Sequence, residues 1–300
     1  MASPSVAVVI PTYDRPQLLR TAVEAVLDQS HRPDEVILVD DGSGDEQRQY
    51  LRDLAEREAL VEVIYQENRG PAAARNRGWR AADSDVVAFT DDDCRPPPNW
   101  LEAFVEGYRE YPEVAGVGSW LAPPDEVAER NAFARFHTFL NREVYEFGDQ
   151  PVVGGEEVPV GGTGSMSYRR EVLAEMGGFD ESFPAAAGED ADLKERVTAA
   201  GHQLLLVPVA VEHRQQYSLS QFVEESVRRG EGVHYFQRKH GTPRGPVRIL
   251  AGLLAAPALG LADLRRTRDP RLVGLSIARR ALGRAGELAA WLETRGGVEG

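Results

Sequence analysis

Short apolar runs alternate with segments of helical periodicity over the first ninety residues of the chain. The runs are four or five residues long and mostly β-branched: Val6–Ile10, Val36–Val39, Val61–Tyr65 and Val86–Phe89. Such runs are typical of strands buried on both faces of a parallel sheet. The segments between them have apolar residues at helical spacing. This order predicts an α/β fold whose central, mostly parallel sheet is doubly wound and flanked by helices.

The pattern becomes less regular after residue 95. We expect an irregular insertion over residues 121–158 with one helix near Val127–Val144, and a flexible turn at Gly161–Gly164. Further on, the pattern predicts a helix from Glu189 or Asp190 to Ala200, two short strands near Gln203–Val207 and Val209–Glu212, and a longer helix over Ser218–His240.

The C-terminal part reads as helices and differs in charge from the rest. Residues 1–240 carry 24 basic and 43 acidic side chains, whereas residues 241–300 carry 10 arginines and 5 acidic residues. We therefore expect one domain over 1–240 and a basic helical extension over 241–300. The apolar stretch Ile249–Ala262 is shorter than the ~20 residues of a membrane span. Two interpretations stay open: helices packed on the domain, or helices lying on an anionic membrane surface.

Charge and cysteine content exclude some classes of protein. The acidic body argues against a nucleic-acid-binding protein, which needs a basic face. The single cysteine, Cys94, cannot form an internal disulfide, and the N-terminus has no basic region before its apolar run. These features fit a cytoplasmic protein, peripheral on the inner face of the plasma membrane if the basic extension binds it.

Acidic residues follow three of the predicted strands. The first strand ends in Pro11-Thr12-Tyr13-Asp14-Arg15, the second in Asp40-Asp41-Gly42-Ser43 and the fourth in Asp91-Asp92-Asp93. Ligands of open parallel sheets bind beyond the carboxyl ends of the strands, so all three ends should share one edge. Each motif alone has a plainer explanation, such as a helix cap at Asp40–Ser43, but three consecutive aspartates repel one another without a cation.

Two common nucleotide-binding motifs are missing. The first turn contains no glycine, which excludes a G-x-G-x-x-G loop, and neither lysine follows a glycine, which excludes a P-loop. A cation held by Asp91–Asp93, with Arg75 as a second positive group, is therefore the candidate for neutralising a diphosphate.

In this order, the motifs resemble those of the family 2 glycosyltransferases, which have the GT-A nucleotide-sugar-binding fold. The resemblance covers about residues 5–240. It rests on Val8–Tyr13, Val39–Ser43, Asn68-Arg69-Gly70, Ala74-Arg75-Asn76, Asp91–Asp93, Gly177-Gly178-Phe179-Asp180, Glu189-Asp190 and His213. One motif alone is weak evidence, whereas the whole series is highly specific.

The resemblance implies a role for each matching position. The donor nucleotide, linked through UDP, GDP or dTDP, would contact Pro11, Thr12, Tyr13, Asp40, Arg75, Asp91 and Asp92. A divalent metal would bind Asp93 and His213, with Asp91 facing the ribose or the metal's waters. The imidazole ligand favours Mn²⁺ over Mg²⁺. Gly162 and Glu189 would border the donor and acceptor pocket.

The resemblance also implies inverting, metal-dependent transfer of a hexose. Asp190 would act as the general base on the hydroxyl of a glycan, polysaccharide or lipid-linked acceptor. Two alternatives remain. A sugar nucleotidyltransferase would need a glycine-rich basic loop and a catalytic lysine. A catalytically inactive nucleotide-sugar-binding protein would be expected to lack some of Asp93, Asp190 and His213, all of which are present.

Overall fold

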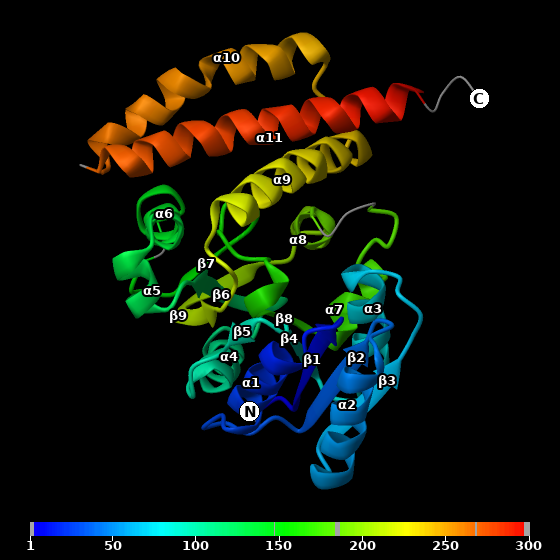
Figure 1. The fold of residues 1–300 in the computed structure, drawn as a ribbon. Coiled ribbons are helices and arrows are strands. Elements are labelled where there is room, and N and C mark those ends of the chain that lie inside the picture. The colour runs from blue at the N-terminus through cyan, green and yellow to red at the C-terminus, as the bar shows by residue number, and fades with distance from the viewer. Residues whose placement is uncertain (1–2, 147, 184–186, 268, 297–300) are drawn as a thin grey trace. The chain divides into compact units, whose positions relative to one another are not determined.

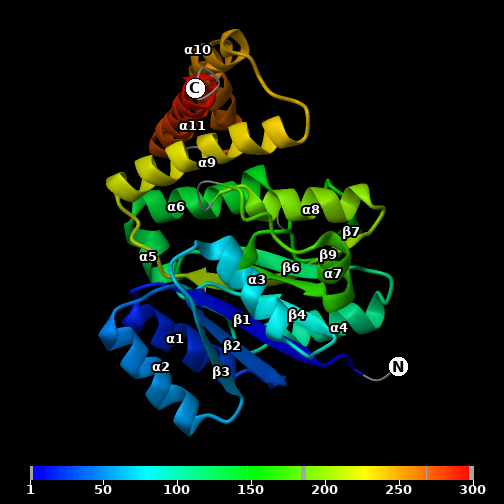
Figure 2. The same ribbon diagram turned by 90° about the vertical axis from the view of Figure 1, so that its right-hand side faces the viewer.

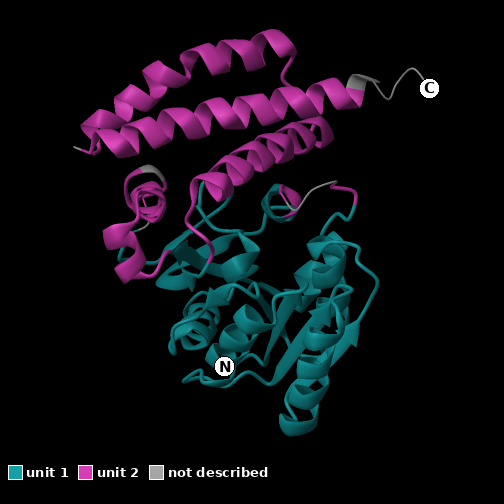
Figure 3. Ribbon diagram, in the orientation of Figure 1, with its two compact units in different colours: residues 1–122, 147–181, 190–214 teal, residues 123–146, 182–189, 215–300 magenta. Residues whose placement is uncertain are grey.

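The computed structural model describes residues 3–146, 148–183, 187–267 and 269–296, which divide into two compact units (Figures 1 and 3). Unit 1 comprises Met1–Ala122, Phe147–Glu181 and Asp190–Arg214, and unit 2 comprises Pro123–Glu146, Ser182–Glu189 and Gln215–Gly300. This division groups the helix at residues 219–239 with the C-terminal helices. The domain boundary placed at residue 240 from the sequence stays a prediction.

Unit 1 is built around one sheet, in which the described residues form nine strands (Figure 1). Their order is β3-β2-β1-β4-β8-β6-β9-β5, and β7 pairs with β9. The strands are β1 Val6–Thr12, β2 Glu35–Asp40, β3 Val61–Tyr65, β4 Val86–Phe89, β5 Cys94–Arg95, β6 Gly116–Ala122, β7 Val152–Gly154, β8 Met166–Arg169 and β9 Leu204–His213. Strands β1 to β4 are parallel as expected, but β8 is antiparallel to both β4 and β6, so the sheet is mixed.

Helices cover both faces of this sheet, as a doubly wound fold requires (Figure 2). Alternate residues of β1 enter different cores: Val8 and Ile10 pack with α1, α2 and α4, whereas Ala7 and Val9 pack with α3, α7 and α8. Pro71, at the first position of α3, has a backbone angle suited to starting a helix. The bounds are α1 Pro16–Leu27, α2 Asp45–Arg57, α3 Pro71–Ala81, α4 Trp100–Glu110, α7 Arg170–Met176 and α8 Glu189–Ala199.

Two strand predictions need correction. Strand β3 lies at the edge of the sheet and is only partly buried, because nothing pairs with its outer side among the described residues. The two strands predicted near Gln203–Val207 and Val209–Glu212 are one strand, β9. Proline at 208 donates no ladder hydrogen bond, but β9 continues past it because the register with β6 shifts between Gly118 and Trp120.

Unit 2 is helical. It contains α5 Asp125–Arg130, α6 Ala132–Phe139, α9 Leu219–Lys239, α10 Pro246–Ala262 and α11 Pro270–Gly296, with short helices at Leu140–Val144 and Asp263–Arg265. The single helix predicted near Val127–Val144 is wrong. The backbone of Asn131 is extended, which ends α5, and its side chain caps α6 by accepting from the amides of Phe133 and Ala134. Phe136, Phe222 and Leu272 form part of the hydrophobic core of unit 2. The expected helical C-terminal extension is confirmed.

Candidate active site

The carboxyl ends of β1, β2 and β4 lie at one edge of the sheet, as the sequence predicted. Thr12 is paired with Asp40 across β1 and β2, and Val9 with Phe89 across β1 and β4. The hydroxyl of Thr12 donates to Asp92 Oδ2 at 2.9 Å, which joins the first strand end to the aspartate triplet. The turn that follows β1 contains no glycine. Asp14 in this turn adopts φ 50°, and its amide donates to Ser43 Oγ at 3.0 Å.

Asp91 is held by Arg75. Helix α3 brings the buried Arg75 to the strand ends, where its Nη2 lies 2.8 Å from Asp91 Oδ1. The guanidinium also lies over the ring of Phe179, 5.9 Å from its centroid. The two residues predicted to contact the nucleotide are thus brought together, and Arg75 offsets one of the three aspartate charges.

Asp93 and His213 also meet, although 120 residues separate them. Their Oδ1 and Nε2 atoms lie 3.4 Å apart. Strand β5 pairs with the end of β9, which sets Cys94 opposite His213, and the amide of Arg214 donates to the carbonyl of Asp93 at 2.7 Å. Burial raises the pKa of Asp93, but the hydrogen bond and charge of His213 together with Arg15 outweigh it, so the pKa is lowered.

Arg15 is a member of the site to which the sequence assigned no role. Its Nη1 lies 3.2 Å from Asp92 Oδ1 and 3.1 Å from Asp93 Oδ2, so one guanidinium joins two adjacent aspartates. The signal in the sequence was its place in the strand-end segment Pro11–Arg15. Its side chain is half exposed, so it lies on the solvent side of the aspartate cluster.

Gln47 is a second residue that sequence reasoning missed. It is buried in α2, and its amide group donates to Thr12 Oγ1 at 3.0 Å, Asp40 Oδ1 at 3.3 Å and Ser43 Oγ at 2.7 Å, while its oxygen accepts from the amide of Arg15. A glutamine in an amphipathic helix gives no signal of such a role. It fixes Asp40, whose side chain is fully buried and also lies 3.4 Å from Arg48.

The remaining positions of the predicted nucleotide pocket differ in exposure. Pro11 is buried within β1, whereas the side chain of Tyr13, just beyond the strand, is 49% exposed. Asp41, the neighbour of Asp40, has a different role. It accepts from the amides of Arg69 and Gly70, just before α3, at 2.8 Å. It therefore fixes the entry to α3 and, through that helix, the position of Arg75.

Asn76 explains why two distant motifs occur together. Its side chain accepts from the amide of Phe179 at 2.9 Å and donates to the carbonyl of Phe179 at 2.8 Å. Gly178 has φ 79°, and a side chain there would collide with Asn76 and Trp79. The backbone of the Gly177–Asp180 motif therefore holds α3 in place through Asn76, which is next to Arg75 in the sequence.

Asp190 is connected to the same edge through a glycine loop. A Cβ atom at Gly162 would lie 3.9 Å from Asp190 Oδ2. Two residues on, the carbonyl of Gly164 accepts from Thr90 Oγ1 at 3.0 Å, and Thr90 directly precedes Asp91. The segment predicted as a flexible turn contains a short 3-10 helix at Thr163–Ser165. Glu189, predicted to border the pocket, is buried.

The donor set fits a divalent cation. Asp93, Cys94 and His213 each offer a ligand atom, and these atoms lie within 4.8 Å of one another. Neighbouring ligands of an ion bound at ~2.1 Å are about 3 Å apart, close to the distance between the Asp93 and His213 atoms. Burial and the adjacent aspartates raise the pKa of the Cys94 thiol well above its usual range, so the carboxylate and the imidazole are the natural ligands.

Asp92 gives the site a pH-dependent cost in stability. Burial, and then the charges of Asp93 and Asp91, raise its pKa to about 6 despite the favourable charge of Arg15 and the Thr12 hydrogen bond. The folded pKa exceeds that of the unfolded chain, so the ionised carboxylate destabilises the fold above pH 6, and this cost fades as the pH falls toward 4.

We expect Asp92→Asn to raise the free energy of unfolding of the metal-free protein by about 3 kcal/mol at pH 8 and by much less at pH 4. Urea unfolding with a chelator present measures both values. Asp91→Asn is the control, because Asp91 has an ion pair with Arg75 and should lose stability. An equal gain for Asp92→Asn at both pH values would contradict the electrostatic explanation.

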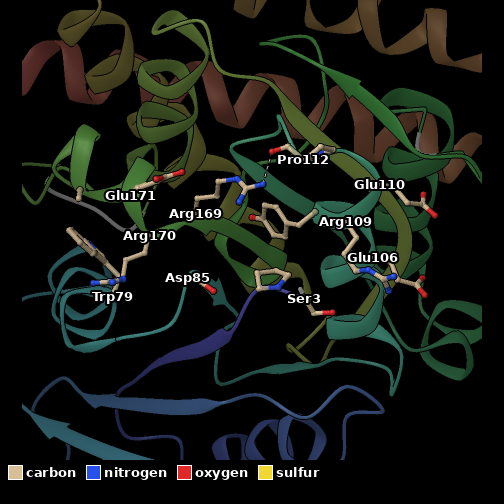
Figure 4. Close-up of a pocket in the computed structure, with 13 residues that line it drawn as sticks. Ser3, Trp79, Asp85, Glu106, Arg109, Glu110, Pro112, Arg169, Arg170 and Glu171 are labelled. Carbon is tan, nitrogen blue, oxygen red and sulfur yellow. Dashed lines mark hydrogen bonds between the residues drawn. The ribbon is translucent and has the colours of Figure 1, made fainter. Parts of the chain in front are cut away.

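A cavity lies elsewhere in unit 1, next to the amino ends of β1 and β4. It measures about 1040 Å³ and is lined by Ser3, Asp85 and Arg169 among others (Figure 4). Two of its arginines are engaged by the protein itself: Arg169 donates to the carbonyls of Val114 and Pro112, and Arg170 donates to that of Ser84. Size alone therefore does not make it the active site, because the carboxylate cluster lies beyond the opposite strand ends.

Comparison with known proteins identifies the family of the chain. The family model described as "Glycosyl transferase family 2" matches residues 7–177. The chain is 30% identical over 281 residues to the pre-mycofactocin glycosyltransferase of Mycobacterium tuberculosis, covering 91% of this chain and 57% of that protein. It is 32% identical over 179 residues to the glucosyl-dolichyl phosphate glucuronosyltransferase of Haloferax volcanii, covering 58% and 56%. The matches thus span little more than half the length of these relatives.

Solved structures resemble the chain over most of its length. A mannosyltransferase from Pyrobaculum calidifontis, solved with GDP-Man and Mn²⁺, aligns over 98% of this chain and 87% of its own with a TM-score of 0.66 and 21% identity. GalNAc-T7, solved with UDP, GalNAc and Mn²⁺, aligns over 78% of this chain and 50% of its own with a TM-score of 0.56 and 18% identity. At these identities the likeness shows the fold, and the predicted α/β class is confirmed.

Proposed function

Because the chain belongs to glycosyl transferase family 2, we propose that it transfers a hexosyl group from a nucleotide-sugar donor to an acceptor hydroxyl, with inversion of the anomeric carbon. The observation that carries this proposal is the joining of Thr12, Arg15, the Asp91–Asp93 triplet and His213 at one sheet edge. Carboxylates that can bind a cation lie there beside guanidinium groups that can bind phosphate oxygens.

The residues of this chain divide the work of the reaction. The acceptor oxygen attacks the anomeric carbon, Asp190 takes the proton from that oxygen, and the bond from the carbon to the diphosphate breaks on the opposite face. Arg75 and Arg15 contact the diphosphate in this proposal, and Asp91 contacts the nucleotide. When bound at Asp93 and His213, a divalent cation, which we propose to be Mn²⁺, offsets the negative charge of the leaving group.

We expect one class of nucleotide sugar to stabilise the protein only when Mn²⁺ is present. Thermal-shift measurements against UDP-, GDP- and dTDP-sugars, with and without the metal, identify that class. A ligand at a hundred times its dissociation constant stabilises by about 2.7 kcal/mol, which is readily measured. Stabilisation by no donor under any condition would contradict the proposal.

A catalytically inactive donor-binding protein would give the same thermal shift. Slow hydrolysis of the donor separates the two, because only an enzyme breaks the anomeric bond. Metal-dependent release of the nucleoside diphosphate is the outcome expected here.

We also propose that unit 2 associates with the cytoplasmic surface of a membrane, where a lipid-linked acceptor would be presented. Helix α10 supports this through apolar side chains left exposed, with Val247 at 78% and Leu254 at 82%. Among the described residues, one helical segment, Pro246–Arg265, is long and apolar enough to cross a membrane by length and composition, and 22% of it is buried.

Replacing two exposed apolar residues should release the protein from membranes. We expect Val247→Asn with Leu254→Asn to lower the fraction that floats with anionic vesicles, since each removes apolar surface from the lipid. Leu219→Asn is the matched control, because Leu219 is also exposed, at 64%, but lies on α9. Equal flotation of all variants would argue against α10 as the contact.

A further inference from the structure

A cavity within unit 2 is unusually rich in arginine. Its volume is about 520 Å³, within the range of small-molecule sites, and most of its lining residues belong to α9, α10 and α11. Figure 1 shows these three helices. Five of its lining residues are arginines: Arg229, Arg244, Arg279, Arg280 and Arg284. Nothing in the proposed transfer reaction uses these side chains.

The walls of this cavity are fixed by close helix packing. A side chain at Gly230 of α9 would collide with the carbonyl of Gly283 of α11, and one at Gly286 would collide with that of Val227. On the other side, Gly252 of α10 leaves room for the guanidinium group of Arg284. Glycines thus let three helices approach closely, which holds the arginines of different helices around one space.

The arginines outnumber their acidic partners. Glu287 is the one carboxylate in the lining; it is 1% exposed and pairs with Arg284 and, at 3.3 Å, with Arg244. Arg280 pairs with Asp263 at 3.2 Å. In the part of the chain that the structure describes, no ion pair joins Arg229 or Arg279 to a carboxylate, and Arg279 donates instead to the Tyr145 hydroxyl at 3.0 Å.

Burial and like charges both lower the pKa of the Arg279 guanidinium. Burial lowers the pKa of Arg279, and the neighbouring charges of Arg229 and Arg280 lower it further, against the opposing effect of Tyr145. The like charges of Arg229 and Arg280 thus add to the unfavourable effect of burial on the charged form of Arg279. An anion there would replace this repulsion with charge-assisted hydrogen bonds.

We infer that this cavity binds the phosphate group of an anionic phospholipid. Guanidinium groups match phosphate oxygens in pairs, which suits Arg229 and Arg279. The cavity also has an apolar, solvent-facing side, where Leu259 is 52% and Val233 is 39% exposed. Leu259 belongs to α10, the helix with the exposed apolar face, so a lipid with its phosphate in the cavity has apolar surface beside it for its acyl chains. This inference deepens the proposed membrane association.

The test uses a soluble lipid, so that binding to the site is separated from general attraction to a charged surface. Short-chain phosphatidylglycerol below its micelle concentration is titrated into the full chain by calorimetry, with short-chain phosphatidylcholine and inorganic phosphate as further probes. The variant Arg229→Gln with Arg279→Gln is compared with Arg265→Gln with Arg271→Gln. The latter pair is exposed in the same unit and does not line the cavity.

We expect saturable, one-to-one binding of phosphatidylglycerol that weakens at least about tenfold in the cavity variant and less than about twofold in the control. Circular dichroism and thermal unfolding confirm that both variants fold. Equal weakening in both variants, or binding of inorganic phosphate as tight as that of the lipid, would overturn the inference. Donor-dependent thermal shifts are measured on the same samples, so a failure of this site is distinguishable from a failure of the proposed transferase.

Discussion

Replacing Asp190 with asparagine should abolish sugar transfer while leaving donor binding nearly unchanged. A positioned general base contributes about 10²- to 10⁴-fold to the rate, and asparagine cannot accept the proton of the acceptor hydroxyl. The expected result is a fall of kcat in this range with the metal-dependent thermal shift by the donor preserved. Rates of nucleoside diphosphate release and thermal shifts measure the two effects.

The position of Asp190 supports this expectation. It lies in the first turn of α8, where the helix dipole favours a negative charge, and its Oδ1 accepts from the amide of Ala191 at 2.7 Å. Glu195→Gln on the same helix is the control, because it removes a carboxylate away from the helix start. Loss of donor binding in parallel with transfer would show that Asp190 holds the donor and does not act as the base.

The strand ends of this site were predictable because their signals are local. Buried parallel strands are short and β-branched, and the topology then places Thr12, Asp40 and Asp91 at one edge. Asp190 and His213 carry no such local signal. They became candidates through the resemblance to a family, and the structure brings His213 to Asp93 through the pairing of β5 and β9.

The residues that sequence reasoning missed act through long-range contacts. Gln47 joins the ends of two strands, yet a polar residue at a helical position reads as ordinary surface. Asp40 and Asp41 are neighbours in the same motif, but they have different partners. Asp40 is buried and accepts from Gln47, whereas Asp41 accepts from the amide of Gly70. Only the fold separates their roles. The arginine-lined cavity was hidden for the same reason, since its members come from three helices and a loop.

Replacing Asp93 with asparagine should remove the metal dependence of donor binding. The substitution keeps the shape of the side chain but removes the charge that a divalent cation requires, and it leaves His213 without its carboxylate partner. At donor and Mn²⁺ concentrations that stabilise the wild-type protein by about 2.7 kcal/mol, we expect no metal-dependent stabilisation of the variant. Thermal-shift titration of Mn²⁺ with a fixed donor concentration is the measurement.

Arg15→Gln is the informative control for this experiment. It removes the ion pair that Arg15 makes with Asp93, at 3.1 Å, but keeps both proposed metal ligands. Because Arg15 and a cation compete for the same carboxylates, the apparent affinity for Mn²⁺ should be retained or rise in this variant. If Asp93→Asn kept its manganese dependence while Arg15→Gln lost it, the aspartate would serve to hold the arginine, and the guanidinium of Arg15 would be the group that neutralises the diphosphate.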